Sequence, residues 1–142
     1  MHIRRLKQED YDALVEIWAA AGLPSRLRGR DAKEHFQSEI DRETAIFLGA
    51  EVDGALVGVV LGTHDGRKGW INRLAVLPDH RRRGIGRALV LETEKKLNEL
   101  GIKIVTCLIE GENDASASFF ESLGYIGRPD ITYYAKRQSP DW

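Results

Sequence analysis

Four arginines and two glycines are concentrated in residues 81–87, which read Arg-Arg-Arg-Gly-Ile-Gly-Arg. They lie between a strand-like segment, residues 70–76, and a segment with helical periodicity, residues 85–100. The first N–H groups of a helix have no partner within it and carry partial positive charge, so they bind phosphate well. Gly84 and Gly86 lack a Cβ atom, which lets such N–H groups approach an anion closely. The pattern predicts a site for a pyrophosphate.

The glycine spacing alone is weak evidence, because a tight connection between a strand and a helix also uses glycines. A Walker-type phosphate loop would need Gly-Lys-Ser/Thr at this point, and the chain has no such sequence here. A dinucleotide-binding fingerprint would need a third glycine three residues after Gly86, where the chain has Leu89. Both of these nucleotide-binding motifs are excluded, and a plain connection or an anion site remains.

The elements that position this cluster follow from hydrophobic periodicity and turn residues. We expect strands over residues 2–6, 44–52, 55–63, 70–76, 103–109 and 131–137. We expect helices starting after Asp10 and over residues 31–40, 85–100 and 114–123. Strand, helix and strand around the cluster form a βαβ unit, which makes its two strands parallel. The fold class is therefore α/β with a mixed sheet, and its ligand belongs at the carboxyl ends of the strands.

Finer expectations concern one turn and two helices. Asp53-Gly54 separates two apolar runs and predicts a type I′ hairpin turn. Asp10 is expected to cap the first helix. The buried stripe of that helix is expected to comprise Tyr11, Leu14, Val15, Trp18 and Ala19. The buried face of the helix over 85–100 is expected to comprise Ile85, Ala88, Leu89, Leu97 and Leu100.

The composition indicates one globular domain over residues 1–142, with a core over about residues 3–137. Hydrophobic residues make up 42% of the chain and charged residues 30%, which suits a domain with a sizeable core. The formal net charge of −1 argues against general binding to nucleic acid or a membrane surface. Cys107 is the single cysteine, and no apolar run reaches the about 18 residues of a membrane span. We expect a soluble cytoplasmic protein.

Two separate motifs resemble those of the GNAT family of N-acetyltransferases. Residues 74–89, Leu-Ala-Val-Leu-Pro-Asp-His-Arg-Arg-Arg-Gly-Ile-Gly-Arg-Ala-Leu, resemble its motif A with the signature Arg/Gln-x-x-Gly-x-Gly/Ala. Residues 112–113, Glu-Asn, followed by residues 119–125, Phe-Phe-Glu-Ser-Leu-Gly-Tyr, resemble its second motif. The hairpin over residues 52–58 also fits, and every expected element is in the family's order.

The resemblance implies a GNAT-like acyl-CoA N-acyltransferase fold, a central mixed sheet of about six or seven strands flanked by about four helices. It implies an enzyme that uses acetyl-CoA, with no metal, and moves the acetyl group to a primary amine by direct attack on the thioester. The acceptor would be a small molecule or a peptide, with no nucleic acid or membrane partner, and formation of a homodimer is left open. The alternative is a non-catalytic acyl-CoA-binding or sensor module.

The resemblance also assigns roles within the site. The cofactor-binding residues it implies are Leu74, Val76, Arg81, Arg82, Arg83, Gly84, Ile85, Gly86, Arg87, Asn113 and Phe120. The backbone of Leu74 and Val76 would hold the pantetheine arm, in a gap between a bulged strand over 70–76 and the parallel strand that follows. The amide near Leu74 or Ala75 would face the thioester oxygen and stabilise an oxyanion. The arginine side chains have a simpler interpretation as surface charge, and Asn113 as a helix cap.

Phe120 departs from the family pattern, because relatives often have a tyrosine there that protonates the departing thiolate. Phenylalanine cannot donate a proton, and a general acid contributes about 10² to 10⁴ in rate. A thiol with a pKa of about 8.5 already leaves fairly well as thiolate, however. Water, Tyr125 or Tyr133 could therefore serve as the donor.

The general base is a second open point. An attacking amine with a pKa of about 10.4 must lose a proton before it reacts. Some relatives have a glutamate on the strand where this chain has Leu108. Glu110 is the first candidate, and Glu112 and His64 are the alternatives. Their simpler interpretations are solvated loop carboxylates and a turn histidine.

Trp18 and the loop over residues 23–30 match the region that shapes the acceptor pocket in similar proteins. Trp18 also fits the core side of its helix, and this simpler interpretation is favoured. The loop contains Arg26, Arg28 and Arg30, which could attract an anionic acceptor or remain solvated. The sequence does not identify the acceptor.

Overall fold

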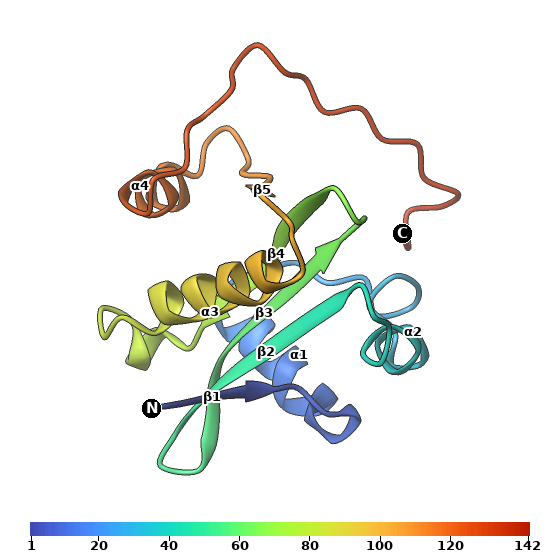
Figure 1. The fold of residues 1–142 in the computed structure, drawn as a ribbon. Helices are drawn as coiled ribbons and strands as arrows, with labels where there is room; N and C mark the ends of the chain where they lie inside the picture. Colours follow the sequence, from blue (N-terminus) through green and yellow to red (C-terminus); the bar gives the residue numbers. More distant parts are fainter.

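The computed structural model describes residues 1–142 and contains one mixed sheet with helices on both faces (Figure 1). The strands are β1 (His2–Arg5), β2 (Ala45–Val52), β3 (Ala55–His64), β4 (Lys68–Val76) and β5 (Ile104–Cys107). The helices are α1 (Tyr11–Ala20), α2 (Lys33–Glu39), α3 (Ile85–Glu99) and α4 (Asp114–Ser122). Two short 3₁₀ helices, η1 (Gln8–Asp10) and η2 (Pro78–His80), precede α1 and α3. None of the helices is both long and apolar enough to cross a bilayer.

The strands are arranged in the sheet in chain order, β1-β2-β3-β4-β5. Neighbours from β1 to β4 are antiparallel, whereas β4 and β5 are parallel and joined through α3. The turn between β2 and β3 has positive φ at both Asp53 (53°) and Gly54 (80°), as a type I′ hairpin requires. The expected α/β fold, mixed sheet, hairpin and βαβ unit are confirmed.

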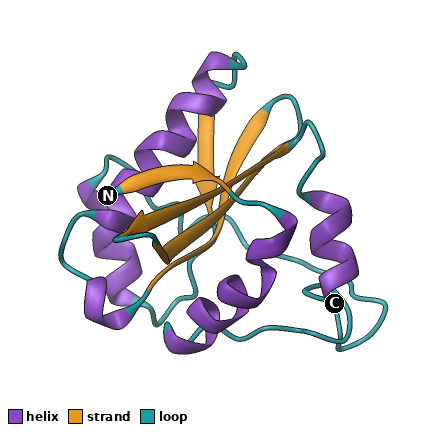
Figure 2. Cartoon of the chain, turned by 90° about the horizontal axis from the view of Figure 1, so that it is seen from below, coloured by secondary structure: helices purple, strands orange, loops and turns teal.

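Two hydrophobic clusters cover the two faces of the sheet. The cluster on the α3 face contains Leu89 and Leu97 of the helix together with Ile46 and Val60 of the sheet. The other cluster contains residues of α1 and α2, among them Trp18, packed on the opposite face. Figure 2, which shows the sheet from below, places helices on both sides of it. The sheet is therefore the middle of three layers, and a ligand between its strands can be reached from either face.

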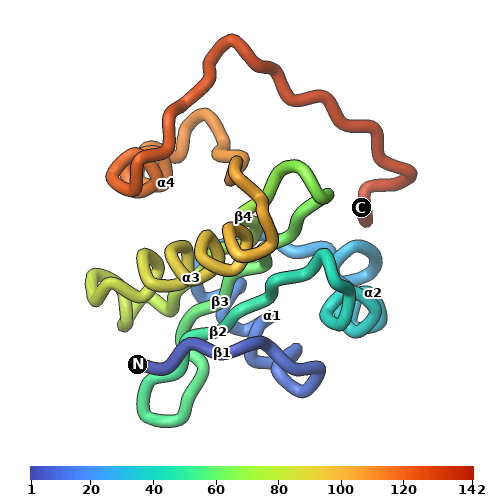
Figure 3. Tube along the Cα trace, viewed as in Figure 1, coloured from blue at the N-terminus to red at the C-terminus, as the bar shows by residue number.

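The expected number of strands was wrong, because the sheet has five and not six or seven. Residues 131–137, the expected last strand, contain no strand. In Figure 3 the chain after α4 runs in a wide arc away from the sheet, so its backbone has no strand to pair with. Tyr133 and Tyr134 consequently remain 63% and 90% exposed. The end of the tail is held instead by loop contacts, such as the Arg30 N–H donating to the Asp141 carbonyl at 2.9 Å.

Three finer expectations were also wrong. Leu100 is 57% exposed, because α3 ends at Glu99 and Leu100 is its C-cap, beyond the last packed turn. Ala19 is exposed, since the buried face of α1 turns through Leu14, Ile17 and Trp18. Asp10 makes no side-chain cap to α1, because its carboxylate accepts instead from the Lys7 N–H at 2.7 Å and from the Arg4 guanidinium. The contact between Asp10 and Arg4 anchors β1 to the start of α1. None of these three residues is among the predicted site residues.

Candidate active site

The arginine-glycine segment forms an irregular turn that leads directly into α3. Arg82 and Gly84 both have left-handed backbone conformations, with φ of 62° and 78°, whereas Arg83 between them does not. Such alternation turns successive N–H groups towards one side and makes a concave anion-binding surface. Gly84 is the N-cap of α3, a helix of 15 residues, so the positive end of the helix dipole faces the same turn.

The backbone amides of this turn are free. Those of residues 82–87 donate to no backbone carbonyl, whereas the Arg81 amide donates to Pro78 O at 3.3 Å and the Ala88 amide to Gly84 O at 3.0 Å. Of the predicted residues, Arg81 can therefore offer its side chain only. Ile85 can offer its amide only, because its side chain is buried in the core on the α3 face. The turn can accept an anion with several donors at once.

The strand before the turn is bulged and separates from its parallel neighbour. Along the β3–β4 pairing, β3 advances from Val59 to Leu61 while β4 covers Asn72 to Ala75, so β4 contains one extra residue. Pairing between β4 and β5 is confined to residues 68–71 of β4. The expected bulge and gap are therefore confirmed.

Leu74, Ala75 and Val76 lie in the part of β4 beyond this pairing, where no β5 residue faces them. Ala75 is buried, and Leu74 and Val76 are half-buried. An unpaired stretch of strand backbone offers N–H and C=O groups to an extended ligand, as an added strand would use them. The stretch ends only a few residues before the turn with the free amides, so the two features form one continuous surface.

Helix α4 lies against the start of α3. A Cβ atom built on Gly86 would lie 3.5 Å from Cζ of Phe119 and 3.9 Å from Val76 Cγ2. Phe120 is buried, and its ring packs edge-on against the rings of Phe119 and Tyr125, each with centroids 5.1 Å apart. Helix α4, the turn and the end of β4 therefore meet at one place.

Asn113 caps α4. Its side-chain oxygen accepts from the Ser116 N–H at 3.0 Å, so the simpler interpretation of this residue holds. The cap fixes the start of the helix that carries Phe119 and Phe120. The amide nitrogen of Asn113 has no partner in the structure's hydrogen bonds and stays available to a ligand.

The candidate acids and bases are placed very differently from one another. Glu110 and Glu112 are exposed in the loop that follows β5, and neither carboxylate is engaged in an ion pair. The Tyr125 hydroxyl donates to Glu94 Oε2 of α3 at 2.6 Å. Burial, and then this hydrogen bond, raise the pKa of Tyr125 above its usual value. Tyr133 is exposed in the tail that follows α4.

His64 behaves as a turn histidine. Its Nδ1 accepts from the Gly66 N–H at 3.1 Å, and its Nε2 lies 3.3 Å from the Glu43 carbonyl oxygen. Nδ1 thus helps to close the turn between β3 and β4, and Nε2 faces the loop before β2. Of the two carboxylate candidates, Glu110 is nearer in sequence than Glu112 to the end of β5.

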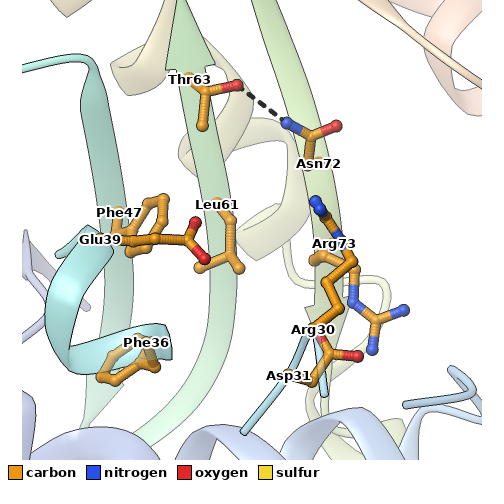
Figure 4. Close-up of a pocket in the computed structure, with 9 residues that line it drawn as sticks. All are labelled: Arg30, Asp31, Phe36, Glu39, Phe47, Leu61, Thr63, Asn72 and Arg73. Atoms are coloured by element: carbon orange, nitrogen blue, oxygen red, sulfur yellow. Dashed lines mark hydrogen bonds between the residues drawn. The ribbon is translucent and has the colours of Figure 1, made fainter. Parts of the chain in front are cut away.

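A small pocket opens on the opposite face of the sheet, beside the bulge. It encloses about 40 Å³. Its lining residues are Arg30, Asp31, Phe36, Glu39, Phe47, Leu61, Thr63, Asn72 and Arg73. In Figure 4 the two arginines and Asp31 gather on one side of Leu61, and Phe36, Glu39 and Phe47 lie on the other. The Asn72 amide donates to Thr63 Oγ1 at 3.1 Å and closes the pocket between β3 and β4.

Arg73 is the residue of this region that sequence reasoning missed. Its backbone is left-handed, with φ of 54°, and its guanidinium lies 4.3 Å from the centroid of the Trp18 ring. No local sequence signal marks the bulge, because an arginine inside a strand-like run is ordinary. Trp18 itself is 2% exposed, so its interpretation as a core residue is confirmed.

No three His, Cys, Asp or Glu side chains come together as a group that could hold a metal ion. The free amides, the unpaired strand and the capped α4 thus meet in one region that can bind an extended anionic ligand. Residues 8–125 match the profile of the acetyltransferase (GNAT) family, which is most of the chain. The chain belongs to this family.

Known proteins agree with this assignment. The chain is 33% identical to an acetyltransferase of Sodalis glossinidius over 142 residues, covering 99% of this chain and 98% of the relative. The crystal structure of PaiA N-acetyltransferase from Thermoplasma acidophilum in complex with coenzyme A is similar, with a TM-score of 0.76 and 29% identity. That comparison covers 86% of this chain and 87% of the other. An aminoglycoside 6′-N-acetyltransferase from Acinetobacter haemolyticus shares the fold, with a TM-score of 0.77, 19% identity and coverage of 98% and 100%.

Proposed function

We propose that this protein is an N-acetyltransferase that moves the acetyl group of acetyl-CoA to a primary amine by direct attack on the thioester. The observation that carries the proposal is the continuity of two features. Free amides over residues 82–87 adjoin a stretch of β4, residues 72–76, that no β5 residue pairs with. Coenzyme A has the matching order of parts, a diphosphate followed by an extended arm with amide groups. The solved relative with bound coenzyme A supports the same choice.

Each part of the site has an expected task. The amides of Arg82, Arg83, Gly84, Ile85, Gly86 and Arg87 would bind the diphosphate, with added positive potential from the side chains of Arg81 and its neighbours. The backbone of Leu74 and Val76 would pair with the pantetheine arm. The amide of Leu74 or Ala75 would stabilise the oxyanion that forms when the amine attacks the carbonyl carbon.

The groups that transfer protons are assigned from their exposure and their hydrogen bonds. Glu110 is our candidate for the base, because its carboxylate is unpaired and follows the end of β5. Phe120 cannot be the acid, and the Tyr125 hydroxyl already donates to Glu94. Since a thiolate with a conjugate pKa of about 8.5 leaves without help near neutral pH, we assign the final proton to water.

One observation favours a second function, a non-catalytic acyl-CoA-binding or sensor module. No side chain with an available proton replaces the tyrosine at Phe120, and the Phe120 ring is buried between two other rings. Replacing Phe120 with tyrosine separates the two functions. Activation by about 10² or more would indicate a degenerate site, because that is the contribution of a general acid. Little change would indicate that water already serves.

The test of the main proposal is release of free thiol from acetyl-CoA in the presence of a panel of amines, with mass spectrometry of the acetylated product. Turnover that requires both an amine and the protein supports the enzyme. If acetyl-CoA binds but no amine, peptide or polyamine is acetylated, the enzyme proposal is wrong and the binding module is favoured. The acceptor is a small molecule or a peptide in this proposal, a dimer is left open, and a cytoplasmic location stays a prediction.

A further inference from the structure

Part of the Arg73 guanidinium is buried without a hydrogen-bond partner. Its Nε and Nη2 atoms are covered by protein and make no hydrogen bond, and no carboxylate forms an ion pair with it. Burial is the main cause that lowers the pKa of Arg73 from its usual value. The Asp31 carboxylate acts on this cation through space but forms no ion pair with it, so hydrogen-bonding groups of the half-desolvated guanidinium remain open to a ligand anion.

The fold holds this guanidinium in place. The bulge in β4 gives Arg73 its left-handed backbone and directs the side chain to the α1 face, where it stacks on Trp18. Arginine on an indole ring is stabilised by cation–π attraction, and its planar fork suits a carboxylate. The side chain is thus preorganised on the face opposite α3.

This position lies next to the expected reaction centre. Arg73 directly precedes Leu74, whose unpaired backbone would face the thioester. The cofactor's expected binding groups, the amides over 82–87, open α3 and lie on its side of the sheet. The pocket around Arg73 lies on the other side, with Phe36 and Phe47 of the second cluster. A second substrate can therefore approach the unpaired end of β4 from the Arg73 side of the sheet.

The pocket has room for one small end group, and the buried guanidinium atoms of Arg73 that lack hydrogen bonds suit an anionic one. Its space of about 40 Å³ would hold about three water molecules, which is enough for a carboxylate. Arg30 adds a second cation to the lining, whereas the Asp31 carboxylate already accepts from the Arg26 N–H at 2.8 Å. Glu39, on the far side of Leu61, disfavours a second negative charge on the ligand.

We infer that the acceptor is a small amine bearing one carboxylate, such as an amino acid. Arg73 binds this carboxylate on the α1 face of the sheet, beside the unpaired end of β4. The inference rests on the proposed function and names the substrate class of that site. It disfavours polyamines and other purely cationic acceptors, because the half-buried guanidinium of Arg73 would repel a cationic end group placed beside it. The short chain distance from Arg73 to Leu74 suits an amine only a few bonds from its carboxylate.

The first test compares matched acceptors that differ only in the charged end group. Neutral L-amino acids, their carboxamides and the corresponding decarboxylated amines are each offered with acetyl-CoA, and thiol release gives kcat/KM. Since hydrogen bonds to a charged group contribute about 1.5–3 kcal/mol, at least one amino acid should exceed its carboxamide by about 10- to 100-fold. Equal or faster turnover of the carboxamides or of spermidine would overturn the inference.

Variants of Arg73 test whether this side chain supplies the preference. Arg73→Met should remove most of the discrimination, lowering kcat/KM for the carboxylate much more than for the carboxamide. Arg73→Lys keeps the positive charge but lacks the planar guanidinium that can bind a carboxylate with two hydrogen bonds, so it should retain an intermediate preference. Both variants keep a non-glycine residue at the same φ, and thermal melting and coenzyme A affinity report whether they fold. Equal losses for carboxylate and carboxamide would indicate a structural role and overturn the assignment.

Binding separates failure of this inference from failure of the proposed function. Calorimetry with the protein saturated in coenzyme A would compare an N-acetyl amino acid, the expected product, with its carboxamide. If no amine turns over but the carboxylate binds about tenfold tighter and Arg73→Met abolishes the difference, the subsite stands and catalysis falls. If amines turn over without any such preference, the function stands and the subsite falls.

Discussion

Gly86 lies beneath the ring of Phe119, so that a Cβ atom on Gly86 would lie 3.5 Å from Cζ of Phe119. This contact joins the first turn of α3 to α4. It explains how two separate motifs, whose contacting residues are 33 positions apart in the sequence, build one site. The glycine gives the aromatic ring room, and the ring covers the helix start whose amides are free.

Because that distance is an ordinary van der Waals contact, Gly86→Ala should fold normally. Alanine favours a helix over glycine by about 1 kcal/mol, so the free energy of unfolding should stay equal or rise. Gly86→Val adds branched carbons that collide with Phe119 and Val76, and should weaken coenzyme A binding by about tenfold. Chemical denaturation and calorimetry measure the two effects. Strong loss of coenzyme A binding in Gly86→Ala would show that the space is needed for the ligand itself.

Gly84 tests the shape of the turn without crowding it, because nothing lies within 4 Å of a Cβ atom built there. Its φ of 78° is left-handed, which costs a residue such as alanine about 1–2 kcal/mol. Gly84→Ala should therefore lower both stability and coenzyme A affinity. Gly84→Asn is the matched control, since asparagine tolerates this conformation better. If alanine and asparagine behave alike in melting and in calorimetry, backbone strain is not the cause.

Glu110→Gln should lower kcat/KM by about 10²-fold, because an amide cannot take the proton of the attacking amine. Coenzyme A affinity should not change, since Glu110 is not among the residues expected to bind the cofactor. Glu112→Gln is the control two residues away, equally exposed and with a neighbouring carboxylate removed. A loss in the control as large as that in Glu110→Gln would move the base to Glu112 or to a shared field of both carboxylates.

Tyr125 gives a pH dependence with a defined sign. Burial and the bond to Glu94 raise its pKa in the folded state, whereas an unfolded tyrosine titrates at about 10. The folded protein thus binds the proton more tightly, so stability is full below pH of about 10 and falls as pH rises above it. Tyr125→Phe should lack this alkaline loss and keep its kcat. Unfolding curves between neutral and strongly alkaline pH measure the first effect; a large fall in kcat would instead make Tyr125 the acid.

Local periodicity and turn residues were enough to predict the hairpin and the βαβ unit around the site. The runs on either side of Asp53 and Gly54 and the segment on either side of α3 have unambiguous signals, and the structure has these elements within a few residues of the expected bounds. The sequence also located the cluster over 81–87 between a strand and a helix, because a run of arginines and glycines at such a position is unusual. These features depend on neighbours in sequence.

Features that depend on distant partners were not predictable in the same way. Residues 131–137 alternate and include two tyrosines, yet a strand also needs an unoccupied neighbour, and the chain after α4 runs away from the sheet. Arg73 is another example, since its stacking on Trp18 links β4 to α1 although the two residues are 55 positions apart in the sequence. Neither local propensity nor charge pattern contains that relationship.

The most direct measurement follows the backbone amides of the ¹⁵N-labelled protein by NMR while coenzyme A is added, with 4′-phosphopantetheine, which lacks the diphosphate, as the control. We predict that the amides of residues 82–87 shift most, and that coenzyme A binds about 100-fold tighter than the control. If the two compounds bind equally, or if coenzyme A leaves these amides unperturbed, the start of α3 does not bind the diphosphate and the account is wrong.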